Sequence, residues 1–81
     1  MIVRILLFAR AKELAGVASM SLELPEGATV AELRAALTAM NARLGDFLPR
    51  CAVAVGGELA SDETALAEGV EVAVLPPVSG G

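Results

Sequence analysis

The last seven residues, "LPPVSGG", are the part of this chain whose residue types suit a reaction. Pro76 and Pro77 fix φ and favour an extended, polyproline-like path away from the residues before them. Gly80 and Gly81 carry no Cβ, so this end could enter a narrow channel and leave the carboxyl carbon of Gly81 open to attack. The pattern predicts a terminal carboxylate that is itself the reacting group.

Little else in the sequence offers chemistry. The 81 residues contain no His and one Cys. Without His there are no His general bases, His-activated nucleophiles or His metal ligands. Cys51 lies in the apolar segment "CAVAV" and is interpreted as a small buried side chain. We therefore expect a protein that is not an enzyme on its own.

The composition predicts a soluble, cytoplasmic protein. The apolar run "ILLFA" at 5–9 is far shorter than the roughly 20 residues that span a bilayer. A lone cysteine suits a reducing compartment. The net charge of -4 argues against nucleic acid, because phosphate binding needs clustered Lys and Arg.

The charges are unevenly distributed along the chain. All six Lys and Arg residues lie at or before Arg50, and five acidic residues follow it without a base. This predicts an acidic C-terminal part towards which a basic partner surface would be steered. An ordinary solvated acidic surface would explain the same pattern.

Residues 2–24 are expected to form two strands with a short helix between them. Branched aliphatic residues at 2–9 predict a strand that is covered on both faces. Residues 10–16 predict a short helix that Gly16 closes. Residues 18–24 alternate between apolar and polar types, which is typical of a half-buried antiparallel strand.

A capping box predicts the start of the main helix. Thr29 stands three residues before Glu32, so each side chain can bond the other residue's backbone N–H. Gly45 is the expected end of this helix. Apolar residues recur between them at the spacing of one helix face: Leu33, Ala36, Leu37, Met40 and Leu44.

The second half of the domain is expected to return to strands. Residues 51–55 predict a short strand, and the glycines at 56–57 predict a turn. Residues 61–66 suggest a helical turn capped by Ser61. Residues 70–75 predict a last strand, which ends at a proline that cannot donate to the ladder.

This order predicts an α+β domain over residues 1–75 and an extended tail over 76–81. One main helix would pack on a mixed sheet of four or five strands. A β-grasp (ubiquitin-like) roll fits, with the first and last strands adjacent and parallel at the centre. Other two-layer arrangements fit the same pattern.

Several stretches resemble the small, sulfur-carrying subunits of molybdopterin synthases, a ubiquitin-like family. They are "LLFARAKELAG", "PEGATVAELRAAL" and "LAEGVEVAVLPPVSGG", and the likeness covers essentially the whole chain. "PPVSGG" is the most specific of these matches, because many β-grasp proteins share the turn and capping signals.

The resemblance implies a cycle of sulfur transfer through Gly81, with Gly80 beside it. A ubiquitin-activating-type enzyme would consume ATP to adenylate Gly81, and a sulfurtransferase would convert the adenylate to a thiocarboxylate. The large synthase subunit would take in the tail and pass the sulfur to a pterin precursor. Such synthases are heterotetramers, and no cofactor would be bound permanently to the carrier.

The same resemblance suggests which residues contact partners. Phe8, Leu59 and Leu75 would form an apolar patch beside the tail, although all three could equally be core residues. The chain departs from its relatives at Gly56, where they often carry Asn, and at Leu75, where they often carry an aromatic residue. These departures affect the expected docking surface. The tail itself would be bound through Pro76, Pro77, Val78 and Ser79.

Three other functions remain open. The thiamine-pathway sulfur carrier shares the fold and the double glycine, but it tends to lack the Pro-Pro-Val exit. A ubiquitin-like modifier would instead join Gly81 to lysines of other proteins. A plain interaction module would not need Gly80 or Gly81 at all.

Overall fold

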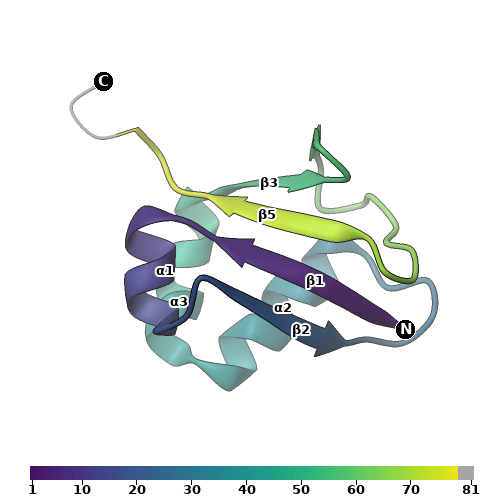
Figure 1. Cartoon of the computed structure of the whole chain (residues 1–81), viewed down its shortest axis with the longest axis horizontal. Helices are drawn as coiled ribbons and strands as arrows, with labels where there is room; N and C mark the ends of the chain where they lie inside the picture. Colours follow the sequence, from purple (N-terminus) through teal and green to yellow (C-terminus); the bar gives the residue numbers. More distant parts are fainter. Residues whose placement is uncertain (79–81) are drawn as a thin grey trace.

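A computed structural model describes residues 1–78 as one sheet with helices on one of its faces (Figure 1). In chain order the elements are β1 (Ile2–Leu7), α1 (Ala9–Ala15), β2 (Ser19–Glu23), α2 (Val30–Met40), α3 (Ala42–Phe47), the 3₁₀ turn η1 (Leu48–Arg50), β3 (Ala52–Val55), β4 (Glu58–Ala60) and β5 (Glu71–Leu75).

The five strands lie in the order β2-β1-β5-β3-β4. β1 and β5 are parallel neighbours at the centre, and the other three pairings are antiparallel. The first and last strands of the domain therefore lie side by side, as predicted. The α+β, β-grasp prediction is confirmed, with five strands and with two short helices beside the main one.

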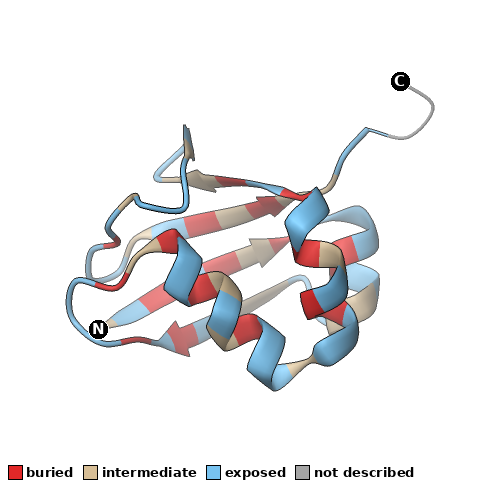
Figure 2. Ribbon diagram, turned by 180° about the vertical axis from the view of Figure 1, so that it is seen from behind, coloured by how far each residue is buried: buried red, intermediate tan, exposed pale blue. Residues whose placement is uncertain are grey.

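The core lies between the sheet and the helix layer (Figure 2). On β1, Val3, Ile5 and Leu7 face the helices and are at most 2% exposed, whereas Ile2 and Arg4 are exposed on the other face. The prediction that this strand is covered on both faces is wrong, because the helices cover only one face. The other face, called the open face below, remains available.

The capping box at the start of α2 is confirmed. The Glu32 N–H donates to Thr29 Oγ1 at 3.4 Å, and the Thr29 N–H donates to Glu32 Oε1 at 3.2 Å. Leu33 and Leu37, one turn apart, are buried against the sheet. The start and the buried face of this helix thus follow from local sequence.

The predicted end of the main helix is wrong. α2 stops at Met40, which is 62% exposed, and Asn41 begins α3. The Asn41 side chain accepts from the Leu44 N–H at 3.1 Å and donates to the Leu14 carbonyl at 3.0 Å. Asn41 thus caps α3 and joins it to α1, which explains why Leu44 is buried although the helix has turned.

Gly45 lies inside α3, where it permits a close approach to α2. A Cβ built on Gly45 would lie 2.5 Å from Thr38 Cγ2 and 2.8 Å from Thr38 Cα. The second contact is with backbone, so a side-chain rotation cannot relieve it. The glycine is therefore required by packing between helices and not by the end of a helix.

We predict that Gly45→Ala lowers the free energy of unfolding by about 1–3 kcal/mol, because overpacking forces the two helices apart. Helix propensity alone predicts the opposite sign, a gain of about 1 kcal/mol. Urea denaturation followed by circular dichroism measures the difference. A rise in the midpoint would contradict the packing argument.

Residues 61–66 form a turn and an extended segment, so the predicted helical turn is wrong. Two carbonyl groups of this segment accept hydrogen bonds from the first residues of α2 instead. The Val30 N–H donates to the Thr64 carbonyl at 3.0 Å, and the Ala31 N–H donates to the Asp62 carbonyl at 2.9 Å. The first N–H groups of a helix lack partners within it, and this loop supplies them.

Candidate functional site

The tail begins where β5 leaves the sheet. β5 ends at Leu75, as predicted, and Pro76–Val78 carry no helix or strand. Exposure increases along this segment, and Val78 is 87% exposed. The predicted binding residue Ser79 and the predicted reacting residues Gly80 and Gly81 lie outside the described residues.

A shallow hollow surrounds the base of the tail. Pro76, Pro77 and Val78 line it on one side. The opposite side consists of Ala9 and Arg10 from α1 with Phe47 and Arg50 from α3 and η1. Two helical segments that are distant in sequence therefore meet the tail where it leaves the domain.

A row of apolar side chains crosses the open face beside the tail. The strand register places Leu59 opposite Ala54, Ala54 opposite Ala73, and Ala73 opposite Leu6. Leu75 lies two residues beyond Ala73 on the same face. This row, with Leu75 and Phe8, is called the open-face patch.

All three predicted patch residues lie at this surface. Leu59 is 76% exposed, Phe8 is 46% exposed, and Leu75 is partly buried. The alternative that all three are core residues is therefore wrong. Phe8 has extended backbone angles and lines a hollow with Arg4 and Leu6, so it continues the open side of β1. That a partner binds here stays a prediction.

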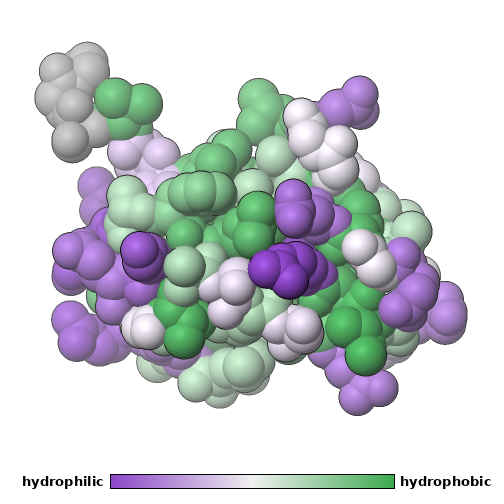
Figure 3. All heavy atoms as spheres, in the orientation of Figure 1, coloured by the Kyte–Doolittle hydropathy of each residue, from purple (hydrophilic) through white to green (hydrophobic). Residues whose placement is uncertain are grey.

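The space-filling view shows the apolar surface on the open face (Figure 3). The Arg4 and Glu71 side chains, whose charged atoms are 4.0 Å apart, bound the patch towards the start of β5. Both side chains are more than half exposed, so this pair contributes little stability. The patch is thus an exposed apolar surface with a charged margin and the tail at its far end.

Gly56, one departure from the relatives' pattern, lies in the turn between β3 and β4. Gly56 and Gly57 have φ values of 57° and 87°. Both are in the left-handed region that two-residue hairpin turns require, and Asn tolerates that region as well. The departure therefore preserves the hairpin that presents Leu59.

Arg34 fixes the segment that leads into β3. Its guanidinium donates to the Leu48 carbonyl at 2.6 Å and to the Cys51 carbonyl at 3.0 Å. Its Nε lies 2.9 Å from Asp62 Oδ1. These bonds tie α2 to η1, and so hold the tail-facing residue Arg50 in place.

Cys51 is buried, as predicted. It is 5% exposed, and its thiol lies 3.6 Å from the Phe47 carbonyl. Burial raises the pKa of the Cys51 thiol, an effect that nearby Arg34 and Arg50 partly oppose. The reactive thiolate is therefore disfavoured at neutral pH.

The sequence did not indicate that the base of the tail is basic. Arg10 and Arg50 line the same hollow as Pro76–Val78, and Arg43 lines the neighbouring one. Glu58 and Glu68 lie at the other end of the sheet, where β3 turns into β4 and where the N-terminus of β1 begins. The acidic C-terminal part that the sequence predicted is therefore not the surface at the base of the tail.

Residues 1–78 offer neither a membrane-spanning helix nor a metal site of clustered ligands. In this part of the chain, no helix is long and apolar enough to cross a membrane. Among the same residues, no group of three or more His, Cys, Asp or Glu side chains could hold a metal ion.

The chain is similar to proteins of known kind over its whole length. It is 37% identical over 81 residues to a molybdopterin synthase sulfur carrier subunit of Chlamydomonas reinhardtii, covering 98% of each protein. It is 31% identical to small archaeal modifier protein 1 of Haloferax volcanii, with a TM-score of 0.87 over the full length of both chains.

A third similar structure contains a partner. It is the protein–protein complex of subunits 1 and 2 of the molybdopterin-converting factor from Helicobacter pylori. The matching chain is 29% identical, with a TM-score of 0.72 and full coverage of both chains. The ThiS family matches residues 5–81, and with the fold and the tail described above this shows that the chain belongs to the ThiS family.

Proposed function

We propose that this protein is the sulfur carrier of a molybdopterin synthase, acting in the cytoplasm and without catalysis of its own. One observation carries the proposal. The chain has left the domain by Val78, which is 87% exposed and is separated by one residue from the Gly-Gly end. The likeness to a sulfur carrier subunit over 98% of both chains supports it.

The proposed cycle begins at the carboxylate of Gly81. A carboxylate oxygen attacks the α-phosphorus of ATP in an adenylating enzyme, and pyrophosphate leaves. Sulfur at the oxidation level of sulfide, supplied by a sulfurtransferase, then attacks the carbonyl carbon, and AMP leaves. The resulting thiocarboxylate is an anion at neutral pH and a strong nucleophile.

The second half of the cycle requires a large synthase subunit. The thiocarboxylate sulfur attacks a carbon of the pterin precursor and displaces an oxygen substituent from it, and water then hydrolyses the acyl–sulfur bond to restore the Gly81 carboxylate. The open-face patch and Pro76–Val78 would contact the subunit that encloses the tail. The subunit 1–subunit 2 complex of the Helicobacter pylori relative supports a partner of this kind.

A ubiquitin-like modifier is the second candidate function. The similarity to small archaeal modifier protein 1 favours it, because a modifier would use the same fold and the same adenylated terminus. The two functions separate after adenylation. A carrier releases its sulfur and recovers a free carboxylate, whereas a modifier forms an isopeptide bond with a lysine.

A single-turnover experiment separates the candidates. The full chain, converted to its thiocarboxylate, is mixed with the large synthase subunit and the pterin precursor. We expect one carrier carboxylate to be restored for each sulfur that appears in the pterin. Isopeptide conjugates in place of pterin sulfur would support the modifier, and sulfur transfer only with a thiazole-forming synthase would support the thiamine-pathway carrier.

A further inference from the structure

The charged side chains are sorted between the two ends of the domain. The end from which the tail leaves carries four cationic side chains and two carboxylates: Arg10, Lys12, Arg43 and Arg50 with Glu13 and Asp46. The opposite end, where β1 and β5 begin, carries four carboxylates: Glu23, Glu26, Glu58 and Glu68. Glu32 and Glu63 lie between the two ends, at the start of α2 and in the loop bonded to it.

The two remaining cations do not alter this separation. Arg4 lies 4.0 Å from Glu71, and Arg34 lies 2.9 Å from Asp62. Each pair is close to neutral as a unit. The net charge of -4 therefore conceals a molecule with a basic end and an acidic end, and the tail leaves through the basic one.

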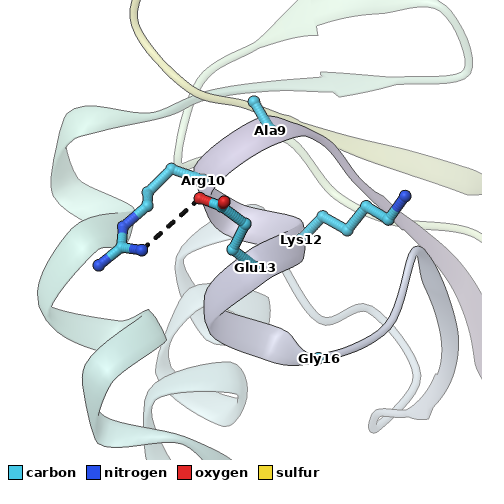
Figure 4. Close-up of a pocket in the computed structure, with 5 residues that line it drawn as sticks. All are labelled: Ala9, Arg10, Lys12, Glu13 and Gly16. Carbon is cyan, nitrogen blue, oxygen red and sulfur yellow. Dashed lines mark ion pairs between the residues drawn. The ribbon is translucent and has the colours of Figure 1, made fainter.

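Two arginines line the base of the tail, and a third lines the adjoining hollow. Arg10 and Arg50 line the hollow that contains Pro76–Val78. The same two arginines also line the adjoining hollow, together with Arg43 and Asp46. Figure 4 shows Arg10 on one side of α1 with Glu13, 3.6 Å away, while Lys12 points to the other side. Any protein that encloses the tail must come against these guanidinium groups.

We propose that Arg10, Arg43 and Arg50 dock against carboxylates around the channel through which the large synthase subunit takes in the tail. The inference rests on the proposed function. Exposed charges of this kind act mainly on the association rate and on orientation. An acidic channel mouth attracts the arginine end and repels the opposite end with its four carboxylates, so the carrier arrives with its tail forward.

The test compares two double variants with equal net charge. Arg10→Gln/Arg50→Gln removes two cations beside the tail. Ala31→Glu/Ala67→Glu adds two carboxylates at residues that line neither hollow beside the tail, one at the start of α2 and one in the loop before β5. All four side chains are exposed, so both variants should fold. Association with the large subunit is followed by stopped-flow fluorescence at about 0.1 M salt. The Debye length is then about 10 Å, so salt largely screens a partner at the tail from charges farther away than this.

We expect the arginine variant to associate about 5- to 10-fold more slowly than the unsubstituted chain, with the difference vanishing near 1 M salt. The alanine-to-glutamate variant should change the rate by less than about twofold. Equal slowing of both variants, or slowing of neither, overturns the inference. A rate loss seen only with the adenylating enzyme also overturns it, because the arginines would then serve another partner.

The same experiment distinguishes failure of the inference from failure of the proposed function. If the unsubstituted chain does not bind the large subunit at any salt concentration, the proposed function fails and the inference fails with it. If the unsubstituted chain binds and both variants bind at its rate, only the inference fails.

Discussion

Deletion of Gly81 is expected to abolish sulfur loading while the domain remains fully folded. The reacting carboxyl carbon would then belong to Gly80, about 3.3–3.6 Å short of its position in the adenylating enzyme. A misplacement of about 1 Å can already cost 100-fold in rate. We therefore expect thiocarboxylate formation to fall by at least about 1000-fold.

The rate is measured by quenched samples and intact-protein mass spectrometry, and folding by urea denaturation. The tail leaves the core at Leu75, so the free energy of unfolding should change by less than about 0.5 kcal/mol. Ser79→Ala is the matched control, because it alters the tail but keeps its length and both glycines. Normal loading of the deletion variant would show that the sulfur is not carried at Gly81.

Leu59→Asp is expected to weaken binding to the large subunit by about 100-fold or more without loss of stability. The Leu59 side chain is 76% exposed, so the folded chain can hydrate a carboxylate there. In a complex, the same carboxylate would be buried within the open-face patch without a partner. Loss of a central apolar contact costs about 2 kcal/mol or more, and burial of the charge adds to it.

Met40→Asp is the matched control for this variant. Met40 is also an exposed apolar residue, at 62%, but it ends α2 in the helix layer, away from the open face. Titration calorimetry should give wild-type affinity for Met40→Asp and weak binding for Leu59→Asp. Equal affinities for the two variants would place the docking surface elsewhere.

The sequence predicted elements well where the signal is local. Thr29 and Glu32 satisfy each other's backbone groups within one turn, so their spacing alone locates the start of α2. The prediction failed where contacts between residues that are distant in the sequence determine the local structure. Gly45 resembled a helix end, yet its role depends on Thr38 of another helix, which periodicity does not show. Residues 61–66 form a single turn, and the carbonyl groups of Asp62 and Thr64 accept from the start of α2.

The candidate site was predictable only in part for the same reason. Phe8, Leu59 and Leu75 came from the resemblance, and the strand register places Leu59 and Leu75 on one face of the sheet. Arg10, Arg43 and Arg50 are scattered along the sequence and meet only because α1, α3 and η1 lie side by side near the end of β5. A count of charges along the chain suggested an acidic C-terminal part, whereas the topology carries Glu58 and Glu68 to the opposite end and pairs Glu71 with Arg4.

The measurement that tests the central claim most directly is the intact mass of the full chain after incubation with ATP, its adenylating enzyme and a sulfur donor. We predict a mass gain equal to the replacement of one oxygen by sulfur, located at Gly81 by fragmentation and lost without ATP. An unchanged mass, with the adenylating enzyme shown to be active on another carrier, would contradict the account.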